Sequence, residues 1–362
     1  MGQRYLLVAW LSLGAILGSA FSLPAQKLEP QVPVVHVNVN MVQLDVAVTT
    51  GRGKYVTGLR PKNFAIYEDG IREKIAAFGE ENGATLDLGH FEAGSNVPLK
   101  REKSAGGKAL TNSPGFSSVA SSSVFILFDT SNYMFRGFAL ARDAIAEFVR
   151  SLNPSDRVAF YSYSRDFFRA CQLTADHAEV LRAVRETVAG DDAALYDALL
   201  WTLEDAGKFS GRRVVVVFSN GPDDASMVSP EDVRELAQSE GIPIYMISTR
   251  EAERDPLSTA VFKRISSSTG GKAYFARRWE DQEKAFASIR ADLAHLYTLS
   301  YYPAPNPNRG WRKITVKLQG KNLKKDHIRT RSGYRPRPIR ATAETFPSPE
   351  NATSSASPSA NR

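Results

Sequence analysis

Residues 124–133 read VFILFDTSNY, five consecutive apolar residues followed by a polar segment that starts at Asp129. An uninterrupted apolar run of this kind is typical of a parallel strand that is covered on both faces of its sheet. In α/β proteins, the loops at the carboxyl ends of such strands bind ligands. The stretch therefore predicts an α/β domain with a candidate site that begins at Asp129.

Helix and strand patterns alternate through the rest of residues 123–295. The apolar positions of residues 138–152 repeat at helical spacing, and residues 213–218 form a second apolar strand. Further helices are expected over 175–188, 195–209, 230–238, 257–267 and 282–293, and further strands over 158–163, 167–173, 244–247 and 272–275. This alternation predicts a doubly wound α/β domain with a mostly parallel, Rossmann-like sheet.

The segments on either side of this domain have the period-two pattern of β-strands. Residues 34–79 contain two such runs and an Asp69-Gly70 hairpin signal, and residues 296–334 contain three more runs. Because neither segment is long enough to bury a secure core alone, each should complete the other. We expect one small β-sandwich domain, with the α/β domain inserted in it or flanked by it.

The chain ends and the first domain junction have other signatures. Arg4 followed by an apolar run over residues 6–17 and then by small residues predicts a signal peptide over 1–25, with an uncleaved anchor as the alternative. A signal peptide implies a secreted, periplasmic or cell-envelope protein. Residues 80–122 are expected to form a flexible linker, and residues 335–362 a disordered tail.

Composition excludes several classes of protein. The chain has 362 residues and one cysteine, which excludes a disulfide scaffold and a multi-cysteine metal site. The net charge of +7 is concentrated between Arg309 and Arg340, where 12 lysines and arginines face one acidic residue. This segment is a candidate contact to an anionic envelope surface, although a solvated strand face is the favoured interpretation. Because the protein is expected to be exported, nucleic acid is not an expected partner.

Several motifs together resemble a known family. The loop that begins at Asp129 resembles the first loop of the von Willebrand factor type A domain. Four further stretches resemble a secreted bacterial subgroup with a flanking β domain: VTGL at 56–59, NFAIYEDG at 63–70, ALYDA at 194–198 and SGY at 332–334. The resemblance covers residues 34–79 and 123–334, and it implies the same α/β fold.

The resemblance also implies a metal-ion-dependent adhesion site. In the family, an Asp-x-Ser-x-Ser loop, a threonine and a further aspartate hold Mg²⁺ or Mn²⁺, which prefer oxygen ligands. Asp129 and Ser131 match the pattern, whereas Tyr133, Ala193 and Asn220 replace the other three ligands. We therefore expect a residual site at Asp129, Ser131 and Asn220 with weakened or abolished metal binding, and no cofactor. The carboxylates that could restore it are Asp191, Asp192, Asp223 and Asp224, which are otherwise solvated turn residues.

No catalytic motif is present in the sequence, so no enzymatic activity is expected. The favoured hypothesis is an exported, non-enzymatic binding or adhesion-type module with a degenerate metal-ion-dependent adhesion site. Its partner would be a protein or an extracellular polymer. The expected binding rim consists of Tyr133, Phe135, Asp191, Asp192, Asp223 and Asp224. The alternative is a structural or assembly component of the cell envelope that docks through its basic β domain.

Overall fold

The computed structural model describes residues 41–80, 86–87, 121–249, 255–276 and 279–336. The expected signal peptide, most of the expected linker and nearly all of the expected tail lie outside these residues. The described residues all belong to one compact unit, 38–340. Within them, no helix has the length and apolar character that crossing a bilayer requires.

The α/β domain is built on a six-stranded sheet with the order β11-β10-β9-β6-β7-β8. All neighbouring strands are parallel except β8, which is antiparallel to β7. The strands are β6 (Ser122–Asp129), β7 (Arg157–Tyr163), β8 (Phe167–Thr174), β9 (Arg212–Phe218), β10 (Ile244–Thr249) and β11 (Ala273–Ala276). The expected apolar strand is thus β6, and it lies in the interior of the sheet.

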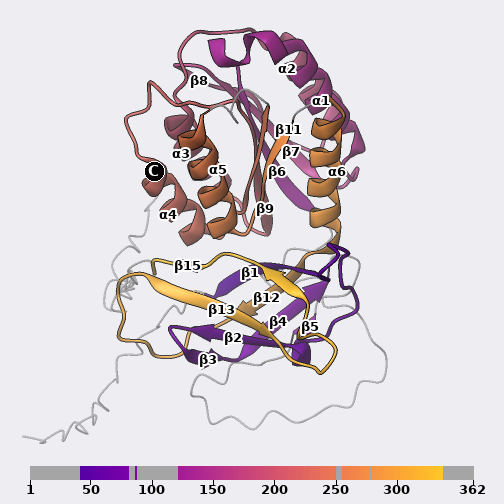
Figure 1. Ribbon diagram of the computed structural model, residues 1–362, viewed down its shortest axis with the longest axis vertical. Coiled ribbons are helices and arrows are strands. Elements are labelled where there is room, and N and C mark those ends of the chain that lie inside the picture. The colour runs from indigo at the N-terminus through magenta and orange to yellow at the C-terminus, as the bar shows by residue number, and fades with distance from the viewer. Residues whose placement is uncertain (1–40, 81–85, 88–120, 250–254, 277–278, 337–362) are drawn as a thin grey trace, which may run out of the picture. The chain divides into compact units, whose positions relative to one another are not determined.

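Helices cover both faces of this sheet (Figure 1). They are α1 (Phe138–Ser151), α2 (His177–Glu186), α3 (Leu195–Gly207), α4 (Pro230–Glu240), α5 (Pro256–Thr269) and α6 (Trp279–His295). Ile126 and Phe128 of β6 pack in the core with α1, α2 and α6, whereas Phe125 and Leu127 pack on the other face with α3, α4 and α5. Both faces of the strand are therefore buried, and the predicted doubly wound fold class is confirmed.

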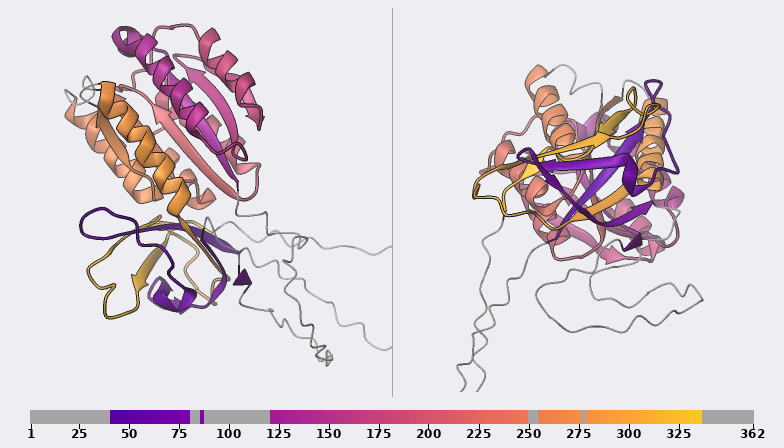
Figure 2. Two further views of the ribbon diagram at one scale, coloured as in Figure 1. Left: turned by 90° about the vertical axis from the view of Figure 1, so that its right-hand side faces the viewer. Right: turned by 90° about the horizontal axis from the view of Figure 1, so that it is seen from below.

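The flanking segments form two antiparallel sheets, with the orders β14-β1-β12-β4-β5 and β15-β13-β2-β3. Their strands are β1 (Val42–Thr49), β2 (Phe64–Glu68), β3 (Ile71–Glu73), β4 (Ile75–Glu80), β5 (Leu86–Asp87), β12 (Tyr297–Tyr301), β13 (Arg312–Leu318), β14 (His327–Arg329) and β15 (Gly333–Tyr334). Strands from the two ends of the sequence alternate: β12 lies between β1 and β4, and β13 pairs with β2. Figure 2 shows this interleaving of indigo and yellow strands from below.

A buried polar cluster lies inside the sandwich. Glu68 is fully buried and pairs with Arg312 at 2.8 Å. The hydroxyls of Tyr301 and Tyr334 both donate to Glu68 Oε2, at 2.8 and 3.0 Å. Because a buried carboxylate is costly without such partners, the cluster fixes how β2, β12, β13 and β15 meet.

Two local expectations need correction. The single strand expected near the end of residues 296–334 is two short strands, β14 and β15, which belong to different sheets. Arg331 lies between them, and its buried guanidinium donates to the backbone carbonyls of Gln238 and Gln43. These contacts direct the chain out of one sheet before it enters the other. In addition, the expected linker contains a strand, because β5 pairs with β4 and Ser122 already belongs to β6.

Candidate functional site

Three loops meet at the carboxyl edge of the α/β sheet. We call this surface the strand-end rim, comprising residues 129–135, 188–194 and 219–228 and the first turn of α5. Gly190 N donates to Thr130 O, and Asn132 N donates to the backbone oxygen of Asp191, both at 2.7 Å. A side chain on Gly190 would lie 2.4 Å from Ser164 Oγ, so glycine permits the close approach of the second loop.

Asp129 lies beneath the rim and is fully buried. One carboxylate oxygen accepts from Ser131 N at 2.9 Å, and the other accepts from Ser219 Oγ at 2.8 Å. The Ser219 hydroxyl in turn accepts from the Tyr163 hydroxyl at 3.0 Å and from Gly221 N at 2.9 Å. Burial raises the pKa of Asp129, although these donors favour its charged form. Asp129 thus holds the first and third loops together.

The remaining family positions supply few oxygen ligands. Ser131 Oγ is buried and makes no hydrogen bond within the described residues, so it is one available oxygen. Ala193 has no side-chain oxygen, and the Asn220 amide donates to Tyr133 O at 2.9 Å. Across the described ranges, no group of three or more His, Cys, Asp or Glu is arranged to hold a metal ion. The three residues offer one carboxylate whose two oxygens already accept hydrogen bonds, one hydroxyl and one amide oxygen, which do not fit a divalent cation that requires about six oxygens.

The two aspartates of the third loop bind backbone groups of the second loop and of α3. Asp224 accepts from Ala193 N at 2.8 Å and from the Tyr133 hydroxyl at 3.0 Å. Asp223 accepts from Tyr196 N at 3.0 Å and from the backbone and hydroxyl of Ser226. Because α3 has Ala194 at its N-cap position, Asp223 substitutes for the missing cap. These carboxylates organise the loops from within the rim.

The two aspartates of the second loop face outward. Asp192 pairs with Arg165 of the β7–β8 hairpin at 3.5 Å; the Arg165 side chain is largely exposed and that of Asp192 is partly exposed. Asp191 is exposed as well. Within the part of the chain that the structure describes, neither aspartate belongs to a group of three or more His, Cys, Asp or Glu side chains that could hold a metal ion. The hypothesis that these residues restore the missing carboxylates therefore finds no geometric support.

Large apolar side chains project from the rim. Phe135 is 76% exposed, whereas the neighbouring Met134 is fully buried in the core under α1. Three further residues were not anticipated from the sequence: Val188 is 78% exposed, Met227 92% and Leu257 73%. The only sequence signal for their exposure was an apolar residue within an otherwise polar loop. An analysis of hydrophobic periodicity does not detect a single residue of this kind. The rim thus combines polar side chains that are hydrogen-bonded to its loops with exposed apolar side chains.

The basic segment between Arg309 and Arg340 divides into two groups. Four of its arginines serve internal contacts: Arg312 pairs with Glu68, Arg329 with Asp292 and Arg335 with Glu235, and Arg331 binds two backbone carbonyls. Among the described residues of the segment, the exposed cations outside these contacts are Arg309 and five lysines, namely Lys313, Lys317, Lys321, Lys324 and Lys325. Four of the twelve cations of the segment therefore stabilise the β domain and its contact with the α/β domain.

The single thiol has no reactive character. Cys171 lies on β8 and is buried, and burial raises the pKa of its thiol to about 11. A thiol with this pKa is protonated at neutral pH and is a poor nucleophile.

The family relationship follows from the sequence of the α/β domain. Residues 123–288 match the family model of the von Willebrand factor type A domain. No curated protein sequence matches the chain. Among solved structures, BatB from Bacteroides thetaiotaomicron is 16% identical over 47% of this chain and 98% of its own, with a TM-score of 0.40. The von Willebrand factor domain of the type V pili tip protein Mfa5 from Porphyromonas gingivalis is 11% identical over 47% of this chain and 94% of its own, with a TM-score of 0.41.

The matched residues are those that form the doubly wound sheet and its rim. The Asp129-x-Ser131 loop lies at the first strand end, where the family resemblance placed it, and the sequence match starts within the same strand. Over residues 123–288, the resemblance inferred from the sequence is confirmed by the match to the von Willebrand factor type A domain.

Proposed function

We propose that this protein is an exported, non-enzymatic binding module whose strand-end rim recognises a protein partner without a bound metal ion. The observation that supports this most strongly is the set of exposed apolar side chains at the rim: Phe135, Val188, Met227 and Leu257. Single exposed apolar residues are common on protein surfaces, but here four loops or helix ends each contribute one at the same edge of the sheet.

The composition of the rim favours a protein over an extracellular polymer. Methionine and aromatic residues are enriched at protein interfaces, where their burial contributes most of the binding energy. Phe135 and Met227 provide such groups, and the hydrogen-bonded carboxylates of Asp223 and Asp224 provide polar groups around them. Because Asp223 and Asp224 already hold the loops in place, little ordering entropy is lost when a partner binds.

Metal independence rests on the donor set around Asp129. Both carboxylate oxygens already accept protein hydrogen bonds, and the second and third loops provide Ala193 and Asn220 where the family has a threonine and an aspartate. Apolar contact takes the place of metal coordination in this proposal. The proposal that the protein is exported rests on the sequence alone, because the apolar run over residues 6–17 has the pattern of a signal peptide.

Substitution of the exposed apolar residues tests the proposal. The Phe135→Ser/Met227→Ser variant removes two apolar groups from the rim, and Trp201→Ser removes an apolar group of α3 that is also exposed. Full-length proteins serve as bait for the extracellular and envelope fractions of the host, and captured proteins are quantified by mass spectrometry. We expect at least one partner to be captured by wild type and Trp201→Ser and lost by the double variant. If the double variant keeps every partner at wild-type amounts and unfolds at an unchanged temperature, the rim is not the binding surface.

A further inference from the structure

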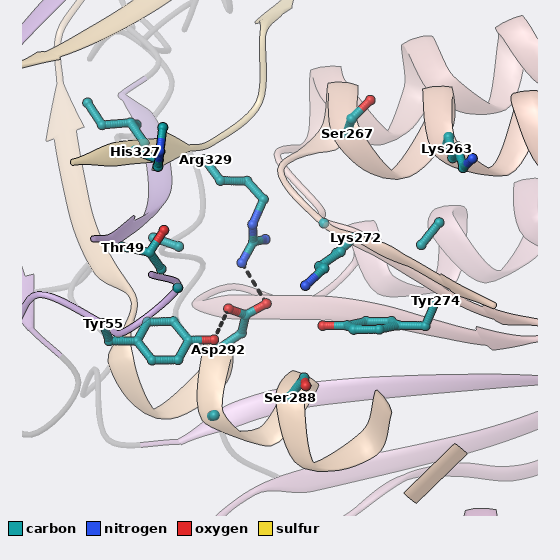
Figure 3. Close-up of a pocket in the computed structure, with 16 residues that line it drawn as sticks. Thr49, Tyr55, Lys263, Ser267, Lys272, Tyr274, Ser288, Asp292, His327 and Arg329 are labelled. Atoms are coloured by element: carbon teal, nitrogen blue, oxygen red, sulfur yellow. Dashed lines mark hydrogen bonds and ion pairs between the residues drawn. The ribbon is translucent and has the colours of Figure 1, made fainter. Parts of the chain in front are cut away.

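We infer that a second site, at the opposite edge of the α/β sheet from the rim, binds a small hydroxylated anion of the size of a sugar acid or sugar phosphate. A cleft of about 650 Å³ lies where α5, α6 and the start of β11 approach β1 and β14 (Figure 3). Its volume falls within the range of small-molecule sites. This inference does not depend on the function proposed for the rim.

One wall of the cleft is held by a neutralised network. Asp292 of α6 pairs with Arg329 of β14 at 2.6 Å and accepts a short hydrogen bond from the Tyr55 hydroxyl. Arg329 also donates to the carbonyl of Gly270, and the Tyr55 ring stacks on His295 at 4.7 Å. In these contacts the charges of Asp292 and Arg329 neutralise each other. They fix the wall without contributing net charge to a ligand.

The cations that remain lie on the other walls. Lys272 Nζ lies 4.9 Å from the centre of the Tyr274 ring, and Lys263 Nζ lies 5.3 Å from that of Phe275. In the part of the chain that the structure describes, neither ammonium group is in an ion pair. Figure 3 shows Lys272 and Tyr274 pointing into the cleft toward Asp292. Aromatic contacts therefore orient these lysines while leaving their charge available to an anion.

Hydroxyl groups complete the lining and indicate the rest of the ligand. Thr49, Ser267, Ser288 and Tyr274 all face the cleft. Ser267 and Ser288 donate their protons to carbonyls of their own helices, so their oxygens can accept from a ligand hydroxyl. Burial and Asp292 raise the pKa of Tyr274, which keeps its phenol protonated as a donor. Two ammonium groups beside several hydroxyls suit a carboxylate or phosphate carried on a polyhydroxylated ring.

Calorimetric titration of the full-length protein tests the site with defined probes. The probes are glucuronate, glucose 6-phosphate and inorganic phosphate, with glucose as the neutral control. The Lys263→Gln/Lys272→Gln variant removes the two lysines of the cleft and leaves the Asp292–Arg329 pair in place. The Lys313→Gln/Lys317→Gln variant removes the same charge from two exposed lysines of β13 and serves as the matched control.

We expect saturable binding of at least one sugar anion, weakened about tenfold in the cleft variant and unchanged in the β13 variant. Glucose should not bind. Binding of glucuronate alone would identify a carboxylate ligand, and binding of glucose 6-phosphate and inorganic phosphate a phosphate ligand. The inference is wrong if no anion binds at millimolar concentration, or if the two variants weaken binding equally.

Discussion

Replacing Asp223 tests whether its carboxylate stabilises the rim or is only a solvated turn residue. Asp223 accepts from Tyr196 N at 3.0 Å, Ser226 N at 3.1 Å and Ser226 Oγ at 2.5 Å. The bond from Tyr196 ties the third loop, which carries Met227, to the first turn of α3, and the two bonds from Ser226 hold the loop's own conformation. The Asp223→Ala change removes all three at once. We expect lower stability of the α/β domain and a looser third loop.

The magnitude follows from these bonds. Each hydrogen bond of a partly buried group contributes about 0.5–1.5 kcal/mol, and loss of a helix cap costs about 0.5–2 kcal/mol. Tyr196 N also donates to Ser226 Oγ at 3.0 Å, so this amide keeps one acceptor in the variant. The loss should therefore be about 1–3 kcal/mol, which corresponds to a fall in Tm of roughly 2–12 °C for a domain of this size. Asp223→Asn should recover most of it, because asparagine caps helices as well as aspartate does.

Thermal unfolding followed by circular dichroism measures this change. Asp192→Ala is the matched control, because it removes an exposed carboxylate of the same rim whose ion pair with Arg165 should contribute about 0–1 kcal/mol. We expect the Tm to decrease in the order wild type, Asp192→Ala, Asp223→Asn and Asp223→Ala. Only the Tm of Asp223→Ala should be clearly below that of wild type. Equal Tm values for Asp192→Ala and Asp223→Ala would refute the capping role of Asp223.

Three further predictions concern buried charge and metal. Glu68→Ala should destabilise the fold by about 3–5 kcal/mol, because it leaves Arg312 buried without its carboxylate, and urea unfolding measures this loss. Because burial raises the pKa of Asp129, the folded state keeps its proton where the unfolded chain has lost it, so this group's contribution to stability falls as pH rises from about 4 through the raised value. Asp129→Asn should remove that component, and an identical pH profile of urea unfolding for the variant would contradict it. Millimolar Mg²⁺ or Mn²⁺ should leave the Tm unchanged, and a saturable increase that Asp129→Ala abolishes would disprove metal independence.

Local sequence patterns were sufficient to predict the architecture of the α/β domain. The apolar run of β6 is buried on both faces by residues that alternate between two helical layers, which is a property of consecutive residues. The Asp69-Gly70 signal likewise gives a two-residue hairpin turn, with φ of 48° and 85° at the two residues. Both features depend on neighbours along the chain, so sequence periodicity predicts them.

Features decided by distant residues were not predictable in this way. The break between β14 and β15 depends on Arg331 reaching carbonyls of Gln238 and Gln43, far away in the sequence. Asp223 had the composition of an ordinary turn, and its role emerges only because the third loop lies against the start of α3. Met227 was missed for the same reason: the sequence shows an apolar residue but not the edge at which it is exposed.

Site-specific photo-crosslinking tests most directly whether the rim is a metal-independent binding surface. A photoreactive phenylalanine analogue is placed at Phe135 or at Met227, and at Trp201 of α3 as the control, in the full-length protein produced by its host. Cells are irradiated with and without EDTA, and adducts are identified by mass spectrometry. We predict the same protein adduct from Phe135 and Met227 in both conditions and no such adduct from Trp201. An adduct that forms only at Trp201, or one that EDTA abolishes at the rim, would contradict the account.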